Sequence, residues 1–284
     1  MGSARDYFDS IAVAADLLDI KLVELPDWNC CGASSGHSLN HRITLNLAAR
    51  NLGLSLDLPQ PLVVPCALCY NRLKVAQAEL IKGHSLVIPE IARLGTDYER
   101  VEVVELNTYL TSPEFIELAE AKKVLDLEGL KPVCYYGCQG QRPPKITGHP
   151  DYENPMGLDN LLAALGADVK DWSFKTDCCG ASHAIARPDI HFEMVTDLYR
   201  RAIEAGANCF VTGCQMCQSN LDLNQKEIAA EMGQEIYLPV FYFTELMGLA
   251  LGKNDAPVWL RRHMVSPKAL LSEINLSKDI QERL

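Results

Sequence analysis

The sequence contains no long apolar run and no surplus of positive charge. No segment of the 284 residues approaches the roughly 18 consecutive apolar residues that suggest a membrane-spanning helix. The N-terminus, MGSARDYFDS, lacks the apolar core of a secretory signal peptide, which predicts a cytoplasmic location. The formal net charge of −11 argues against a nucleic-acid partner, because neutralising phosphates requires an excess of Lys and Arg. Hydrophobic and charged contents of 48% and 22% are typical of a soluble globular protein.

Cysteine, by contrast, is abundant. The chain has 11 cysteines and no visible secretory signal, and clustered cysteines in a reducing compartment indicate metal binding or redox catalysis more often than disulfides. The stretch Cys-Cys-Gly-Ala-Ser occurs twice, at 30–34 and at 178–182. Two adjacent thiols bridge each other only under severe strain, so this stretch predicts a ligand that holds both sulfurs.

Four pairs of cysteines share one offset of 148 residues along the chain. The pairs are Cys30 with Cys178, Cys31 with Cys179, Cys66 with Cys214, and Cys69 with Cys217. In each copy the adjacent cysteines are followed by 34 residues and then by Cys-x-x-Cys. This shared spacing predicts two copies of one unit. The predicted domains are a first repeat over 1–130, with a truncated start, and a second repeat over 131–284 that includes a C-terminal tail.

Short apolar runs alternate with amphipathic segments in both copies. Uninterrupted runs of this length indicate buried strands of a parallel sheet. The expected strands are 63–65 and 210–212, the expected helices are 71–81, 191–207 and 219–232, and further strand–helix passages are expected at 101–110 and 236–247. This alternation predicts an α/β fold of two tandem Rossmann-like units with parallel sheets, related by pseudo-two-fold symmetry. Each cysteine motif then falls between a strand and a helix, at the sheet edge where such folds bind ligands.

The second copy contains one further cysteine, Cys138, which precedes Cys178 by 40 residues. Five thiols are therefore expected to converge there, one more than a tetrahedral zinc ion needs. This second thiol set comprises Cys138, Cys178, Cys179, Cys214 and Cys217. Soft thiolates select iron–sulfur clusters, zinc or Cu(I). Because adjacent cysteines point poorly toward a single ion, the set suits two different irons of one cluster.

These motifs resemble the cysteine-rich CCG domain, and their duplicated form resembles the B-type subunit of heterodisulfide reductase. The resemblance rests on YYGCQGQRPP (135–144), both CCGAS stretches, CALCYNRL (66–73), GCQMCQSNLDL (213–223) and WLRRHMVSP (259–267). In that family each domain can hold a non-cubane 4Fe–4S cluster on five cysteines, at which a disulfide is reductively cleaved. The resemblance implies an oxidoreductase acting on sulfur groups, with the second thiol set as cluster ligands and reaction centre. It also implies a first-repeat cluster on the first thiol set, Cys30, Cys31, Cys66 and Cys69.

The first repeat departs from the family pattern. Residues 1–29 contain no cysteine, so the first thiol set lacks a fifth member. One interpretation is a chain that starts late, which would also remove the first strand of this repeat. The other is a site with four ligands, for which zinc is possible. His37 and His41 are the residues that would substitute for the missing thiol.

Four further residues have candidate roles. Cys134 and Cys209 fall outside the repeat and are interpreted as structural thiols. Arg142, beside Cys138, is a candidate contact for an anionic substrate, because Arg matches carboxylate and sulfonate geometry. His183 follows the second Cys-Cys-Gly stretch and is a candidate proton donor at neutral pH.

The family resemblance also implies partners. The chain has no Cys-x-x-Cys-x-x-Cys-x-x-x-Cys-Pro segment, so its electrons are expected from two separate polypeptides of the complex, a ferredoxin-like subunit and a flavin-containing subunit. The expected substrate is a disulfide or thiol, either small or carrier-bound. One alternative is the CCG-type iron–sulfur subunit of a lactate- or glycolate-oxidising dehydrogenase, whose members carry that ferredoxin segment in the same chain. The other is a structural zinc scaffold.

Overall fold

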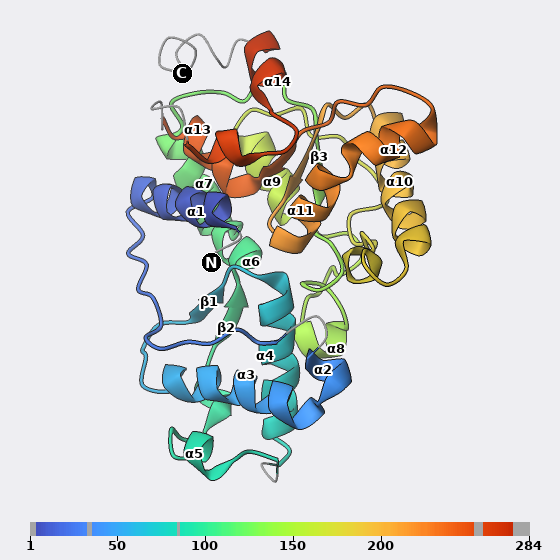
Figure 1. The fold of residues 1–284 in the computed structure, drawn as a ribbon. Coiled ribbons are helices and arrows are strands. Elements are labelled where there is room, and N and C mark those ends of the chain that lie inside the picture. The colour runs from blue at the N-terminus through green and yellow to red at the C-terminus, as the bar shows by residue number, and fades with distance from the viewer. Residues whose placement is uncertain (1–3, 33–35, 84–85, 253–257, 275–284) are drawn as a thin grey trace. The chain divides into compact units, whose positions relative to one another are not determined.

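The chain folds into two compact units, and each unit is built from segments that are not contiguous in the sequence (Figure 1). The computed structural model describes residues 4–32, 36–83, 86–252 and 258–274. The small unit comprises Val23–Tyr109 and Cys138–Tyr152, and the large unit comprises Met1–Leu22, Leu110–Gly137 and Glu153–Leu284. Each sequence repeat thus contributes segments to both units. The repeat boundary between residues 130 and 131 stays a prediction.

The small unit is built on a two-stranded parallel sheet. Strand β1 (Leu62–Val64) pairs with β2 (Val103–Glu105), and Val64 lies opposite Glu105. The helices of this unit are α2 (Gly36–Leu39), α3 (His41–Ser55), α4 (Ala67–Leu80), α5 (Pro89–Ala92), η1 (Tyr98–Arg100), α6 (Leu106–Leu110, which ends at the unit boundary) and α8 (Pro144–Thr147). Buried apolar side chains from α3, α4 and both strands form one core. Asn40 caps α3, because its side chain accepts the Ile43 N–H at 3.1 Å.

The large unit is built on a three-stranded parallel sheet in the order β3–β4–β5. The strands are β3 (Pro132–Tyr135), β4 (Cys209–Thr212) and β5 (Val240–Tyr242), and all of their residues are buried. The helices are α1 (Arg5–Leu17), α7 (Pro113–Lys122), α9 (Gly157–Ala164), η2 (Ala181–His183), α10 (Pro188–Glu204), α11 (Gln215–Leu223), α12 (Gln225–Met232), α13 (Phe243–Ala250), η3 (Val258–Arg262) and α14 (Lys268–Glu273). Helix α1 packs beside α13 in this unit (Figure 1).

The predicted alternation of strands and helices with parallel sheets is confirmed. The sheets are small, and the described part of the small unit contains no counterpart of β3. Helix α10 is confirmed with its buried stripe of Val195, Leu198 and Ala202. The single helix predicted at 219–232 is wrong. The structure has α11 and α12 there, with a break at Asn224, whose side chain donates to the Asn220 carbonyl at 2.6 Å and competes with the backbone pattern.

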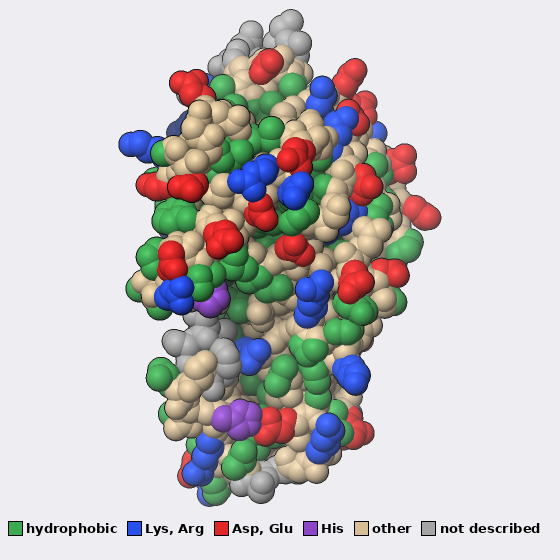
Figure 2. Space-filling view, turned by 90° about the vertical axis from the view of Figure 1, so that its right-hand side faces the viewer, with side chains coloured by type: hydrophobic (Ala, Val, Ile, Leu, Met, Phe, Trp, Pro, Cys, Tyr) green, Lys and Arg blue, Asp and Glu red, His purple; other side chains and the backbone are tan. Residues whose placement is uncertain are grey.

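In the described part of the chain, no helix combines the length and the apolar character that crossing a membrane requires. Figure 2 shows acidic, basic and apolar side chains intermingled on one face of the described residues. On that face the acidic side chains are scattered among other side-chain types and do not form one acidic region.

A buried ion pair ties the C-terminal segment to α13. His263 Nε2 lies 2.9 Å from Glu245 Oε1, and both side chains are fully buried. Burial alone would lower the pKa of His263, but the Glu245 carboxylate, with smaller contributions from Asp222 and Asp6, raises it to about 9. Since an unfolded histidine titrates near 6.5, this pair stabilises the fold fully below about pH 6.5, and the stabilisation is lost as pH rises through about 9.

We therefore expect the melting temperature to fall between about pH 6.5 and 9. A shift of this size corresponds to a contribution on the order of 3 kcal/mol, so the change is measurable by thermal unfolding. The matched variant His263→Gln should show a smaller fall over the same range. Equal pH dependence in the two proteins would contradict the assignment to His263.

Candidate metal centre

The two Cys-x-x-Cys motifs take the same local structure. Cys66 is the N-cap residue of α4 with φ −114° and ψ 114°, and Cys214 is the N-cap residue of α11 with φ −116° and ψ 120°. Each follows the C-terminal end of a strand, β1 or β4. Helix N-termini carry free N–H groups and partial positive charge, which favour thiolates. Each motif therefore lies in a suitable place for an anionic cluster.

The two Cys-Cys-Gly stretches also share their geometry. Gly32 has φ +72° and Gly180 has φ +73°, a left-handed conformation that side-chain-bearing residues rarely adopt. In each pair the first cysteine is exposed and the second is buried. The adjacent thiols therefore differ in environment, as expected if they bind different atoms of one group. In the second copy, the Asn220 amide donates to the Cys179 carbonyl at 2.8 Å and fixes the stretch to α11.

Three thiols of the second set lie together at the N-terminus of α11. Cys179 Sγ is 3.9 Å from Cys217 Sγ. Hydrogen bonds to Cys179 and Cys214, together with burial, raise the pKa of Cys217 well above its ordinary value. The Cys217 thiol correspondingly lowers the pKa of Cys179 against the effect of burial, with help from the Ala181 N–H. The charge on Cys178 acts in the opposite direction, so this fourth thiol is also close.

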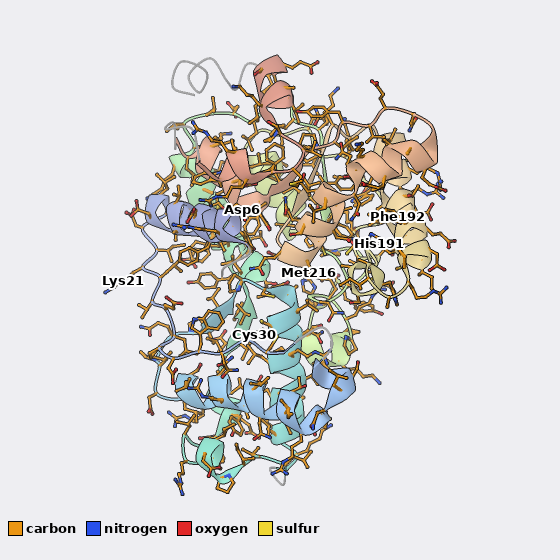
Figure 3. All side chains as sticks on the ribbon, in the orientation of Figure 1. Asp6, Lys21, Cys30, His191, Phe192 and Met216 are labelled. Carbon is orange, nitrogen blue, oxygen red and sulfur yellow. The ribbon has the colours of Figure 1, made fainter. Side chains whose placement is uncertain are left out.

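The same arrangement recurs in the first set. Cys69 shares hydrogen bonds with Cys31 and Cys66, and these bonds, followed by burial, raise the pKa of its thiol. The Cys69 hydrogen bond is the largest cause that lowers the pKa of Cys66 to about 7. Cys69 thus occupies in its set the place of Cys217 in the other. Cys30 lies on the segment between α1 and α2 and is exposed (Figure 3).

Cys138 is half-buried and directly follows Gly137. Gly137 has φ +67°, and a Cβ at this position would lie 2.9 Å from Cys217 Sγ. The glycine thus permits the chain to pass close to that sulfur. The Gln139 amide lies 3.7 Å from Cys138 Sγ. The Asn71 side chain of α4 donates to the carbonyls of Gln139 and Arg142 at 2.9 and 2.7 Å, which fixes the turn after Cys138 within the small unit.

The remaining sequence candidates lie as follows. Arg142 and His183 are exposed, and their proposed substrate contacts stay predictions. Cys134 and Cys209 are buried within β3 and β4, and burial is the main cause that raises the pKa of each thiol. His41 bonds Glu79 at 2.9 Å, so its ring is already engaged away from the thiols. The side chain of His37 lies outside the described residues.

Several residues near the second thiol set were not found from the sequence. Tyr7 of α1 stacks on Tyr242 with ring centroids 4.2 Å apart, and its hydroxyl donates to the Gly213 carbonyl, directly before Cys214. An N-terminal helix of the first repeat thereby supports the second thiol set. His191 of α10 is buried beside Phe192, with ring centroids 5.0 Å apart (Figure 3). Met216, between Cys214 and Cys217, is 41% exposed (Figure 3).

The donor sets fit an iron–sulfur group. Within the ranges that the structure describes, no three His, Cys, Asp or Glu side chains are placed to hold a single metal ion. The soft sulfur donors, the helix N-termini and the glycine that leaves room beside Cys217 suit a thiolate-bound cluster. Assignment of individual cysteines as its ligands stays a prediction.

Duplicated thiol sets at the edges of small parallel sheets define a cysteine-rich α/β protein. The chain belongs to the family of the cysteine-rich (CCG) domain, whose model matches residues 9–74 and 133–222. Both matched ranges contain one Cys-Cys-Gly stretch and one Cys-x-x-Cys motif. The predicted duplication of the CCG domain is therefore confirmed.

The chain is similar over most of its length to two kinds of redox-enzyme subunit. It is 32% identical over 262 residues to the 8-methylmenaquinol:fumarate reductase membrane anchor subunit of Wolinella succinogenes, covering 92% of each chain. It is 27% identical over 263 residues to the B-type subunit of the ferredoxin:CoB-CoM heterodisulfide reductase of Methanosarcina mazei, covering 90% of this chain and 88% of that one. The predicted resemblance to the B-type subunit of heterodisulfide reductase is thus confirmed.

A solved structure shares the fold. The crystal structure of a hypothetical protein from Helicobacter pylori matches with a TM-score of 0.68 at 14% identity. The match covers 92% of this chain but only 49% of the other, so this chain spans about half the length of that protein. This likeness concerns the fold alone.

Proposed function

We propose that this chain is the iron–sulfur subunit of a heterodisulfide-reductase-like complex and performs thiol–disulfide redox chemistry. The observation that supports this most is the recurrence of one thiol arrangement, Cys31–Cys69–Cys66 and Cys179–Cys217–Cys214. Chance packing of small buried residues would not reproduce the same hydrogen-bonded order 148 residues later. The similarity to the B-type subunit of heterodisulfide reductase supports the reaction class.

In this proposal the second thiol set holds a non-cubane 4Fe–4S cluster that serves as the reaction centre. A bound cluster of this kind supplies single electrons to a disulfide. Cys179, Cys214 and Cys217 are buried and would shield the bound group from water, whereas Cys178 is exposed and would lie on the side open to a substrate. Arg142 would bind an anionic group of the substrate and His183 would donate a proton to a product thiolate.

The proposed partners are a ferredoxin-like subunit and a flavin-containing subunit. The sequence contains no ferredoxin cysteine segment, so a second polypeptide would have to deliver electrons. The similar proteins from Wolinella succinogenes and Methanosarcina mazei are both named as subunits. We expect a stable complex with a ferredoxin-like protein in material from the native source.

A second candidate follows from the fumarate reductase relative, which has the higher identity of the two. In this alternative the same cluster exchanges electrons with a quinol in a complex that acts on a dicarboxylate. The exposed Met216 between two thiols of the second set would suit an apolar electron carrier.

Metal analysis is the direct test of the proposed function. Protein purified without oxygen should be brown and contain about four irons and four sulfides for each occupied site. Zinc in place of iron, with no acid-labile sulfide, would support a structural scaffold and contradict the proposal.

Reoxidation kinetics distinguish the two candidate reactions. Dithionite-reduced protein should be reoxidised by a small disulfide such as the CoB–CoM heterodisulfide, followed by the visible absorbance of the cluster. Rapid reoxidation by a menaquinone analogue alone would instead favour the quinol reaction.

A further inference from the structure

A buried carboxylate at the end of β2 has no hydrogen-bond partner among the described residues. Glu105 is 3% exposed, and no described residue donates to either Oε1 or Oε2. Nearly all buried polar side chains in native proteins have a partner, and an unpaired buried carboxylate costs several kcal/mol in its ionised form. A partner that belongs to the working protein, such as a cation, would remove this cost.

Glu105 lies beside the first thiol set. It is opposite Val64 in the β1–β2 register, and Cys66 follows Val64 by two residues at the same edge of the sheet. The strand that ends at Glu105 is therefore hydrogen-bonded to the strand that leads into Cys66. The carboxylate therefore shares the sheet edge with the sulfurs of Cys31, Cys66 and Cys69.

A glycine makes room for this carboxylate. A Cβ at Gly140 would lie 2.3 Å from Oε1 and 2.7 Å from Oε2 of Glu105. The Gly140 backbone belongs to the turn that Asn71 fixes against α4. The carboxylate therefore occupies a space that any side chain at position 140 would close.

The residue that corresponds to Glu105 in the other sheet is of a different type. Val64 of β1 corresponds to Thr212 of β4 by the 148-residue offset, and the strand partner of Thr212 is Tyr242. Glu105 and Tyr242 thus hold equivalent places at the ends of their strands. The repeat with the carboxylate has four cysteines, whereas the repeat with the tyrosine has Cys138 as a fifth.

We propose that Glu105 supplies an oxygen ligand to the iron–sulfur group of the first thiol set. Carboxylates are established ligands of iron in proteins. The inference rests on the proposed function, because it requires an iron–sulfur group in the first repeat. It adds a residue of a different chemical type to the four thiols.

The test uses the full chain with Cys214→Ser and Cys217→Ser, which leaves iron only in the first repeat. In this background Glu105→Gln should lower iron occupancy about tenfold or more, since even residues that only support a ligand change metal affinity by 10–100-fold. Glu105→Cys should retain iron. Glu102→Gln is the matched control, because Glu102 is an exposed carboxylate on the same segment and should leave occupancy unchanged.

Mössbauer spectra of ⁵⁷Fe-loaded protein give a readout independent of activity. An oxygen-bound iron should contribute a component with a larger isomer shift than sulfur-bound irons, and Glu105→Cys should abolish that component. Unfolding of the metal-free protein separates a ligand from a structural residue. Glu105→Gln should leave this stability unchanged or raise it, because it removes an unpaired buried carboxylate.

The outcomes distinguish the inference from the proposed function. Iron in the parent chain but none in the Cys214→Ser/Cys217→Ser background, or full iron and an unchanged spectrum in Glu105→Gln, would overturn the role of Glu105 alone. Loss of stability of the metal-free Glu105→Gln protein with iron retained would do the same. Absence of iron and sulfide from the parent chain would overturn the proposed function as well.

Discussion

Replacing Cys217 with serine is expected to empty the second thiol set of iron. Its sulfur is the central member of that set, 3.9 Å from Cys179 Sγ and hydrogen-bonded to Cys214 as well. Serine removes a soft thiolate ligand and leaves a hydroxyl that binds iron weakly at neutral pH. The expected result is loss of nearly all second-repeat iron, measured together with acid-labile sulfide on protein purified without oxygen.

The matched control for this variant is Cys209→Ala. Cys209 is fully buried in β4, outside the repeated pattern, so its removal should reduce stability by about 1 kcal/mol and leave the iron content unchanged. Equal iron loss in both variants would indicate that cluster retention depends on general packing of the sheet. Full iron in Cys217→Ser would contradict the ligand assignment directly.

The grouping of Cys31 with Cys66 and Cys69, and of Cys179 with Cys214 and Cys217, could be predicted because its evidence is a spacing, whereas the roles of these cysteines as ligands stay a prediction. An offset of 148 residues and two Cys-Cys-Gly stretches require equivalent backbone paths in both copies. The structure shows these equivalent backbone paths. Gly32 and Gly180 are both in the left-handed conformation, and Cys66 and Cys214 have nearly the same φ and ψ angles. The buried strand at 210–212 was predictable for a similar reason, since its uninterrupted apolar run matches a central parallel strand.

Contacts between distant segments were not predictable in the same way. The position of α1 beside α13, with Tyr7 bonded to the Gly213 carbonyl, joins residues 206 positions apart that share no sequence pattern. His183 was singled out because it follows the second Cys-Cys-Gly stretch, yet it is exposed, whereas His191, which no sequence motif marks, is buried. Burial of a single polar side chain depends on tertiary packing, which one sequence does not encode locally.

The burial of Glu105 was predictable in part from the sequence. Side chains alternate between the two faces of a strand, so Glu105 shares a face with Val101 and Val103, both of which are buried. Glu102 lies on the other face and is exposed. The stretch 101–105 thus contains a signal from which a buried carboxylate could have been predicted, because Glu105 follows the same alternation as two valines.

Replacing Lys175 with methionine is expected to destabilise the large unit by about 3–5 kcal/mol, since it leaves an uncompensated buried charge. Lys175 is 1% exposed, and its Nζ lies 2.9 Å from Asp159 Oδ1 and 3.0 Å from Met156 Sδ. Tyr136 donates its hydroxyl hydrogen to Asp159 at 2.5 Å and so belongs to the same network. Denaturant unfolding of the metal-free protein would measure the loss in the free energy of unfolding.

The exposed pair of Lys170 and Asp168 provides a matched control for this loss. Its atoms are 2.6 Å apart, closer than those of the buried pair, but water screens it, so Lys170→Met should cost less than about 1 kcal/mol. Adding Asp159→Leu to Lys175→Met should recover part of the loss, because it removes the unpaired carboxylate. A loss below about 1 kcal/mol for Lys175→Met would contradict this account.

Lys175→Met also tests whether the stability of the large unit affects iron retention at the second thiol set. The Lys175 carbonyl accepts the N–H groups of Tyr136 and Gly137 at 2.9 and 3.1 Å, and Gly137 is the residue that passes close to Cys217 Sγ. Loosening the Lys175 segment should therefore raise the rate at which a chelator removes second-repeat iron. Iron in the first repeat, whose proposed ligands belong to the small unit, should be lost at the parent rate, and equal acceleration at both sites would show that the effect is global unfolding.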